Sequence, residues 1–423
     1  MFKLYRVTLV QPANATRRRR SMVCAERADV ERLIIRGPTE FISSAEVGGP
    51  IDNFIANLLA NRMPSAKTRE SFYGLLKTYL TVRPDLAYAL DKSAGQVNNP
   101  ALGSAICRMQ EAMAGGKDLA TAIKAHLIRA IPKPDVAALT AAVGVGTPLL
   151  AVEKLQQKAK FQVGLRGRVK KAAAYPMIVM FLATGVLTFV ATQELPKMVK
   201  TLSDFQSTPS GVVVLVFGAG HFIQQYPFIT YLPLVLVTAA LVFSQRLYTT
   251  AFVQRAITLI PPLRRLVFKT AMAQSLFTYA MLARSRVPTI EALQLASEET
   301  LSPSIRKFFA TTCLRLSQGT PSLFEAAIPN ADILGHDGYE FVSLMQAGEQ
   351  SGNSADIAET VAQAYRRDSE EAVDILTQLI NPALLIIVGI MVLAVGIMTL
   401  APIAQLYKDA IPQVLGGARA FGH

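Results

Sequence analysis

Few side chains in this sequence have the type and spacing that chemistry at a protein site requires. Zinc needs three or four histidine, cysteine or carboxylate ligands close together, as in the His-Glu-x-x-His and Cys-x-x-Cys motifs, and neither motif is present. A Gly-x-Ser-x-Gly turn, which would expose a nucleophilic serine, is also missing. We therefore expect no catalytic residue, no metal site and no cofactor. The histidines and cysteines stand far apart, at His126, His221, His336 and His423 and at Cys24, Cys107 and Cys313.

One glycine-rich segment, Gly115 to Asp118, contains a lysine and is the natural place to look for nucleotide binding. A phosphate-binding loop needs Gly-x-x-x-x-Gly-Lys followed by Ser or Thr, because backbone N–H groups surround the phosphates and the hydroxyl binds Mg²⁺. This segment has neither that spacing nor the hydroxyl. Any ATP-driven function must therefore take its energy from a partner protein.

Glycine and proline residues instead mark an internal repeat. Gly146 is followed thirty residues later by Pro176, and Gly352 is followed thirty residues later by Pro382. The two copies are 206 residues apart, and in each copy a helix-forming stretch leads to an apolar run. An internal repeat sets the plan of the whole fold, which here is a soluble helical segment that continues into a membrane helix. This plan is typical of a scaffold rather than of a catalyst.

The two copies are predicted to be helical bundles over residues 51–171 and 246–374. Proline interrupts both at matching places, Pro84 in the first and Pro288 in the second. Proline is favoured in the first turn of a helix, so Pro288 is expected to begin one. Five or six helices of ordinary length fit the first copy. A further matched break is Gly116 with Gly319.

Three runs are apolar enough to cross a membrane, which takes about 20 residues of helix. Residues 172–193 have no ionisable side chain, and residues 379–403 lie within a longer uncharged run. The middle run, 205–245, is too long for one span. We therefore divide it into an interfacial helix at 211–225 and a span at 226–243.

Lysine and arginine cluster beside these runs, and such clusters mark the cytoplasmic side of a membrane protein. Seven basic residues and one acidic residue lie between positions 152 and 171, and five basic residues with no acid lie between 246 and 269. We therefore place the segments before 172 and at 246–374 in the cytoplasm and the tail, 404–423, outside. The net charge of +13 then reflects topology and attraction to anionic lipid. Nucleic acid is excluded as a partner because no aromatic residues are interleaved with the basic ones.

Residues 1–50 form a small separate unit ahead of the first repeat. Leu4 to Val10 alternates as a strand does, Pro12 to Asn14 is a turn, and Ala25 to Ile35 is compatible with a helix. The arginines at 17–20 indicate a solvated strand or turn near anionic lipid, or a contact with a partner. The predicted fold class is an all-α polytopic membrane protein with two tandem cytoplasmic helical-bundle repeats, three transmembrane helices and a small N-terminal α/β extension.

The motif around the second glycine resembles that of one protein family. Residues 346–353 read Gln-Ala-Gly-Glu-Gln-Ser-Gly-Asn, Asn381-Pro382 opens the third apolar run and Tyr175-Pro176 opens the first. With these motifs, residues 55–410 resemble the inner-membrane platform proteins of type II secretion systems and type IV pili. The first copy departs from the family pattern because it has no glutamate between residues 141 and 146. This departure favours a type IVb or conjugative-pilus member.

The resemblance implies a multi-pass protein of the bacterial inner membrane that couples a hexameric cytoplasmic ATPase to insertion of pilin subunits into a filament. Its N terminus would be cytoplasmic and its C terminus periplasmic. It also implies contacts with other inner-membrane assembly proteins and a homo-oligomer. The alternative is the equivalent platform of a type II secretion system, with pseudopilins as the subunits. A polytopic transporter is a distant alternative, because its repeats would lie inside the membrane.

Several residues in and near the repeated motif are candidates for structural or interaction roles. Glu349 is interpreted as a helix cap or an interdomain salt bridge, or alternatively as a subunit-interface or cation contact. Pro176 and Pro382 are interpreted as first-turn residues of membrane helices, where a missing N–H costs nothing. Gly389 and Gly396, seven residues apart on one helix face, indicate close packing of the spans or a groove for a pilin. The other candidates are Pro288 and the helix-junction glycines Gly146, Gly348 and Gly352, of which Gly352 is expected to be left-handed.

Overall fold

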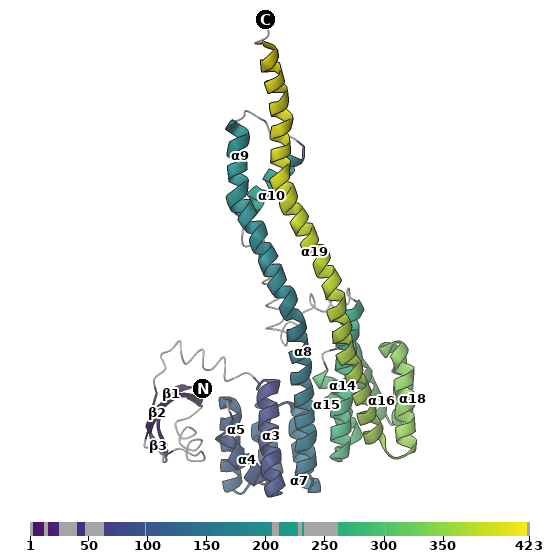
Figure 1. Cartoon of the computed structure of the whole chain (residues 1–423). Helices are drawn as coiled ribbons and strands as arrows, with labels where there is room; N and C mark the ends of the chain where they lie inside the picture. The colour runs from purple at the N-terminus through teal and green to yellow at the C-terminus, as the bar shows by residue number, and fades with distance from the viewer. Residues whose placement is uncertain are drawn as a thin grey trace. The chain divides into compact units, whose positions relative to one another are not determined.

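The computed structural model describes residues 3–11, 16–24, 40–46, 63–97, 99–204, 211–226, 231, 261–300 and 302–420. The chain falls into two compact units. Unit 1 comprises residues 1–166 and 265–370, and unit 2 comprises residues 167–264 and 371–423. Figure 1 shows the elements with their labels. Within unit 1 we call residues 63–166 repeat 1 and residues 265–370 repeat 2.

Repeat 1 contains five helices and the beginning of a sixth, which continues beyond it. The first turn of a helix leaves backbone N–H groups without a partner inside the helix, and a side chain just before that turn can accept a hydrogen bond from one of them. Four helices of repeat 1 begin with such a capping side chain. The caps are Ser65, Asp85, Asn99 and Asp118, with hydrogen bonds of 3.2, 3.1, 2.9 and 3.0 Å to the N–H three residues on. The helices are α3 (Ala66–Val82), α4 (Leu86–Ala94), α5 (Pro100–Ala114), α6 (Leu119–Leu127), α7 (Lys133–Val145) and α8 (Pro148–Phe189).

Repeat 2 has the same order of helices, with one short 3₁₀ segment added. Pro288 stands immediately before α15 as its N-cap, with a φ of −53°, so the prediction that it begins a helix is confirmed. The elements are α14 (Pro261–Arg284), α15 (Thr289–Glu299), α16 (Pro303–Ser317), α17 (Leu323–Ala327), η2 (Ile328–Leu334), α18 (His336–Gln350) and α19 (Ser354–Ala420).

The glycines that mark the repeat end corresponding helices in the same way. Gly146 and Gly352 have φ values of 75° and 69°, and Gly116 and Gly319 have values of 90° and 97°. After Gly146, the N–H of Thr147 donates a hydrogen bond to the carbonyl of Ala142 at 3.0 Å. After Gly352, the N–H of Asn353 donates to the carbonyl of Gly348 at 2.9 Å. This closure needs a left-handed residue, which glycine adopts without steric cost. The left-handed conformation predicted for Gly352 is confirmed.

The buried apolar side chains of the two repeats form one continuous cluster in unit 1. In repeat 1 the side chains of Phe72, Leu76 and Leu80 are fully buried, at the spacing that places them on one face of α3. In repeat 2 the ring of Phe308 lies 5.4 Å from that of Phe309 and 5.8 Å from that of Phe341. Edge-on aromatic packing of this kind stabilises a core beyond its buried area.

The two prolines of the repeated motif do not begin helices, so the first-turn interpretation is wrong. Pro176 lies inside α8 and Pro382 lies inside α19, each 28 residues after the first residue of its helix. Each therefore removes one hydrogen bond from a continuous helix. Each helix nevertheless continues past its proline.

Among the described residues, two helices are long and apolar enough to cross a membrane, over Pro148–Thr201 and Ser354–Ala404. Many of their apolar side chains in unit 2 are exposed, among them Leu182, Leu385 and Ile390, each at least 61% accessible. The span predicted at 226–243 lies outside the described residues except for Tyr226 and Tyr231, so three spans remain a prediction. The other helical segments of unit 2 are a π-helical turn, η1 (Val190–Glu194), α9 (Leu195–Asp204) and α10 (Val212–Gln225).

The first residues form a three-stranded antiparallel sheet in the order β2-β1-β3. Strand β1 (Lys3–Gln11) includes the predicted strand, and it pairs with β2 (Thr16–Cys24) and β3 (Glu40–Glu46). The helix predicted at Ala25–Ile35 lies outside the described residues. The α/β character of this extension therefore stays a prediction.

Candidate functional site at the interface between the two repeats

The two long helices α8 and α19 lie side by side in unit 1, with their chains running in the same direction. Lys154 of α8 forms an ion pair with Glu359 of α19. Seven residues further along both helices, the guanidinium of Arg366 lies over the ring of Phe161, 4.9 Å from its centre. A step of seven residues is about two helical turns. The helices therefore keep one register across this stretch.

A buried lysine between these two contacts joins the repeats. Lys158 Nζ donates to Asp135 Oδ1 at 2.9 Å, within repeat 1, and to Glu299 Oε2 at 2.7 Å, at the end of α15 in repeat 2. The side chains of Lys158 and Asp135 are only 3% and 1% accessible. The Thr278 hydroxyl also donates to Glu299 Oε2, at 2.7 Å. The Lys158 ammonium group therefore binds one carboxylate from repeat 1 and one from repeat 2.

Asp135 has further partners on α3. The Tyr73 hydroxyl donates to its Oδ2 at 2.7 Å, and the Arg69 guanidinium lies 3.5 Å from the same oxygen. Arg69 also donates to Gln162 Oε1 at 2.8 Å. With Glu299, the cluster contains two cations and two anions. Charges can stay ionised in an interior only when they are paired and hydrogen-bonded in this way.

The pairing shifts the titration of the buried groups. Burial raises the pKa of Asp135, but the charges of Lys158 and Arg69 and the hydrogen bonds to Tyr73 and Lys158 outweigh burial and hold that pKa below its ordinary value. Burial lowers the pKa of Lys158, and the two facing carboxylates reverse this and raise it. Burial, and then the charge of Asp135, raise the pKa of Tyr73 well above its usual value. At neutral pH the lysine and the aspartate are therefore both charged.

The ion pairs between the repeats have one polarity. A third pair, Lys133 with Glu298 at 2.8 Å, is exposed, and in all three described pairs the cation comes from repeat 1 and the anion from repeat 2. The repeats also differ in composition, since repeat 1 has 14 lysines and arginines against 7 acidic residues and repeat 2 has 9 against 12. Complementary charge favours this pairing over contact between two like repeats.

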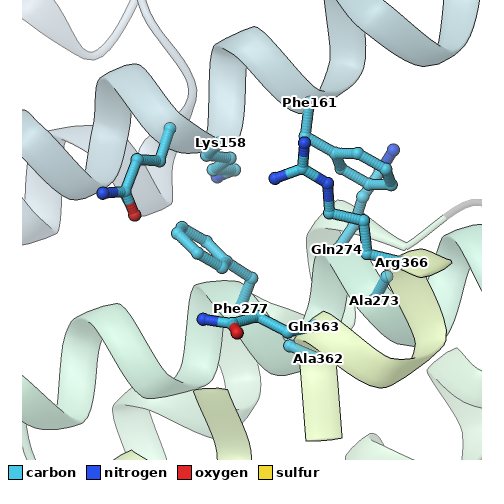
Figure 2. A pocket seen from close by; sticks show the side chains of 9 residues that line it. Lys158, Phe161, Ala273, Gln274, Phe277, Ala362, Gln363 and Arg366 are labelled. Carbon is cyan, nitrogen blue, oxygen red and sulfur yellow. The ribbon is translucent and has the colours of Figure 1, made fainter. Parts of the chain in front are cut away.

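A small cavity of about 70 Å³ lies beside Lys158, where α8, α14 and α19 meet. Figure 2 shows Phe277 beneath Lys158 and Arg366 against Phe161. The wall carries the amides of Gln157, Gln274 and Gln363. The wall also carries apolar side chains, among them Phe161, Phe277 and Ala362, so this part of the interface combines amide groups with apolar ones.

Glu349 lies away from this interface and holds the start of α17. Its carboxylate accepts hydrogen bonds from the Ser322 hydroxyl at 2.7 Å and from the backbone N–H groups of Leu323 and Phe324 at 2.8 and 3.1 Å. Partial burial raises the pKa of Glu349, and these donors outweigh it and lower that pKa. Of the alternatives considered for this residue, the contacts correspond to helix capping.

The glycines of the motif fall into two kinds. A Cβ atom placed on Gly348 would lie 3.1 Å from Ile357 Cβ and 3.1 Å from Ser354 Cα, so this residue allows α18 to approach α19 closely. A Cβ on Gly146 or Gly352 would meet no described atom within 4 Å, so these positions need glycine for backbone conformation alone. Gly389 and Gly396 also have no described atom that close, and the choice between packing and a groove stays open.

Comparison with known proteins matches the repeat directly. The family described as type II secretion system (T2SS), protein F, matches residues 72–196 and again residues 276–402. The chain belongs to this family. The two matches begin in α3 and α14 and end in α9 and α19, so each copy includes a bundle, a junction glycine and an apolar segment. The internal repeat predicted from the glycine and proline spacing is confirmed.

Relatives of this T2SS protein F family member come from two kinds of machine. The type IV pilus assembly protein PilC of Thermus thermophilus is 26% identical over 342 residues, covering 78% of this chain and 80% of its own. The protein of the same name from Myxococcus xanthus is 24% identical, covering 72% of each chain. The type II secretion system protein F of Pseudomonas aeruginosa is 22% identical, covering 78% of this chain and 80% of its own.

Sequence reasoning missed the buried cluster of this family member. Lys158 was counted among the basic residues that set topology, and Asp135 and Glu299 were not singled out. A signal was present, because Asp135 lies three, four and seven residues before the buried residues Ala138, Leu139 and Ala142. This spacing places all four on one face of α7. A carboxylate on the core face of a helix requires a buried partner. The sequence alone does not say that this partner bridges to the other repeat.

Proposed function

We propose that this chain is the inner-membrane platform of a type IV pilus assembly machine. In this proposal a hexameric cytoplasmic ATPase acts on the two repeats, and the motion passes through α8 and α19 to pilin subunits in the membrane. The supporting observation is that both helices leave the inter-repeat interface without a break and continue into apolar segments. A continuous helix transmits displacement along its axis because its backbone hydrogen bonds run in that direction.

The energy for assembly must come from a partner. The sequence has no Gly-x-x-x-x-Gly-Lys-Ser/Thr phosphate-binding loop. A machine that lifts subunits out of a membrane therefore needs a separate ATPase. The exposed surfaces of the two repeats are the parts of the chain available to it on the cytoplasmic side.

The proposed location is the bacterial inner membrane, with the N terminus in the cytoplasm and the C terminus in the periplasm. The basic clusters beside the apolar segments support this orientation. A periplasm-dependent reporter fused at Gln350 should be inactive, whereas one fused at Gly417 should be active. Activity at Gln350 would contradict the orientation.

The second candidate is the platform of a type II secretion system, since three of the relatives are named type II secretion system protein F. Pilus assembly is favoured because Val143 occupies the place in repeat 1 that Glu349 occupies in repeat 2. The family pattern has glutamate in both copies, so its loss points away from a housekeeping secretion component.

Deletion of the gene followed by complementation separates the two functions. We expect loss of pilin from the sheared surface fraction, normal export of secreted enzymes, and recovery of surface pilin with the wild-type gene. The full chain in detergent should also retain the pilus ATPase on an affinity resin. Normal surface pilin in the deletion strain would refute the proposal, and loss of enzyme export instead would establish the secretion alternative.

A further inference from the structure

A proline interrupts the backbone hydrogen bonds where α8 passes through the π-helical turn η1 into α9. In this turn the N–H of Leu195 donates to the carbonyl of Val190, five residues earlier. The next carbonyl, that of Ala191, would take its hydrogen bond from Leu195 in an α-helix or from residue 196 in a π-helix. The N–H of Leu195 is already used, and Pro196 has no N–H. The Ala191 carbonyl is therefore left without a donor from its own helix.

A glutamine near the end of α10 supplies the missing donor. The Gln224 Nε2 atom donates to the carbonyl oxygen of Ala191, 33 residues away in the chain. Ala191 is completely buried, and a buried carbonyl without a partner destabilises a fold. The N–H that Pro196 lacks and the side-chain amide of Gln224 thus belong to one interaction.

Apolar packing brings the same segments together. Gly220 allows α10 to lie directly on α9, because a Cβ atom at this position would be 2.7 Å from Leu195 Cδ1. Figure 1 shows α10 beside α19, and Met398 of α19 is buried at this contact. The contact therefore joins α8, α10 and α19 within unit 2. Its described members are Val190, Ala191, Leu195 and Met398, with Leu187, Phe217, Ile223 and Val395 packed against them.

We propose that Gln224 is a positioning residue that replaces the N–H missing at Pro196 and thereby holds α10 against the π-helical turn. The sequence predicts an interfacial helix at 211–225, and this hydrogen bond specifies what the helix is held against. Its role in assembly rests on the proposed function. A displacement of α8 along its axis then carries α10 with it, so that the pilin is displaced by segments that move as one unit.

The proline offers a rescue that distinguishes this interaction from general packing. Gln224→Leu removes the donor and should lower the thermal unfolding midpoint of the full chain in detergent by about 2–4 °C. Pro196→Ala returns an N–H to the helix, which can then pair with the Ala191 carbonyl. In the Pro196→Ala chain, Gln224→Leu should therefore shift the midpoint by no more than about half as much.

Gln225 provides the matched control. It is the same residue type at the next position of α10, whereas the Ala191 carbonyl accepts its hydrogen bond from Gln224. Gln225→Leu should leave the midpoint within about 1 °C of wild type. Equal shifts for the two glutamine variants, or the same shift for Gln224→Leu with and without Pro196, would overturn the proposal.

A cross-link reports the position of α10 without unfolding the protein. Leu195→Cys and Gly220→Cys are combined in the full chain, with the three native cysteines replaced by alanine, and a short bis-methanethiosulfonate reagent is applied in lipid vesicles. Gln224→Leu should lower the yield of the 195–220 product, and adding Pro196→Ala should restore it. A yield that Gln224→Leu leaves unchanged would show that apolar packing alone holds α10.

Surface pilin tests the role in assembly separately. Gln224→Leu should reduce pilin in the sheared surface fraction, and Pro196→Ala in the same chain should restore it. Normal surface pilin in the Gln224→Leu strain, together with a weakened cross-link, would overturn this role. Failure of the wild-type gene to restore surface pilin would instead refute the proposed function.

Discussion

Repeat 1 and repeat 2 share an order of helices but bury different groups at corresponding positions. Asp135 of α7 corresponds to Phe341 of α18, 206 residues later, and Arg69 of α3 corresponds to Ser275 of α14. Phe341 packs against the ring of Phe308, whereas Asp135 binds a lysine that reaches repeat 2. The fold of one repeat therefore does not need the carboxylate. In repeat 1 it accepts a hydrogen bond from Tyr73 of the same repeat and binds the lysine that also reaches repeat 2.

The same comparison applies to the start of the short fourth helix of each repeat. In repeat 1, Asp118 caps α6 from the position next to it. In repeat 2 the corresponding helix, α17, has a local cap in Ser322, and its first N–H groups also donate to the carboxylate of Glu349, which is 26 residues further along the chain than Leu323. A local cap holds one helix end, but a distant cap also ties α18 to α17. The distant cap is thus a link within repeat 2 that Asp118 does not provide in repeat 1.

The largest expected effect comes from removing the lysine that joins the repeats. Lys158→Met leaves Asp135 and Glu299 without their shared cation, and loss of one partner of a buried charge pair costs about 3–5 kcal/mol. The thermal unfolding midpoint of the full chain in detergent measures this cost. Lys133→Met removes the exposed pair with Glu298 and should cost at most about 1 kcal/mol. Equal midpoints for the two variants would show that the buried cluster does not hold the repeats together.

Acid should weaken the same cluster. The folded pKa of Asp135 is lowered, so its contribution to the free energy of unfolding is complete above the ordinary aspartate pKa, near 3.9, and is lost as pH falls through the lower, folded value. Lys158 has a raised pKa, so its contribution is complete below about 10.4 and is lost as pH rises through the raised value. Between these limits the contribution is constant.

Unfolding midpoints measured from pH 3 to pH 7 check the acid side, in wild type and in Asp135→Asn. The difference between the unfolding midpoints of the two proteins should become smaller as pH falls below about 4. A gap that is independent of pH would mean that Asp135 is not ionised in the folded protein.

The next largest expected effect comes from substituting a glycine at a helix junction. Gly352→Val places a β-branched residue at a φ of 69°, which costs about 1–2 kcal/mol, and it should also abolish surface pilin by tilting the start of α19. Gly352→Ala should cost about 1 kcal/mol. Gly144→Ala, inside α7 with no described atom near the added Cβ, is the control and should not destabilise the protein. Normal surface pilin with Gly352→Val would remove this glycine from the mechanism.

The smallest effect is a gain in stability. Arg286 has a φ of 57° and is the one residue other than glycine with a positive φ among the described residues. It ends α14, and the N–H of the next residue bonds to the Leu282 carbonyl at 3.0 Å, the closure that glycine provides elsewhere. Arg286→Gly should therefore raise the free energy of unfolding by about 0.5–1 kcal/mol, measured as a higher unfolding midpoint. A lower midpoint would show that the arginine side chain stabilises the turn.

The sequence by itself determined the plan of this protein. Because glycine is favoured where a helix ends in a left-handed residue, the spacing of Gly146 and Gly352 predicted two corresponding helix junctions. Because long uncharged runs cannot be covered by a core of this size, the runs after them predicted membrane helices, and the described residues include two helices that are long and apolar enough to cross a membrane. Local conformation and hydropathy depend on neighbouring residues, so both can be read along the chain.

Only the tertiary structure decided what joins the two copies. Lys158 and Glu299 are 141 residues apart, and nothing in the residues near either one specifies the other. Pro176 and Pro382 show the same limit, because a proline at the edge of an apolar run is equally compatible with a helix start and with the interior of a longer helix. The outcome there depends on how far the helix extends before the proline, which is fixed by packing of α8 and α19 in unit 1. Contacts between distant segments are set by shape and charge together, and these exist only once each repeat has folded.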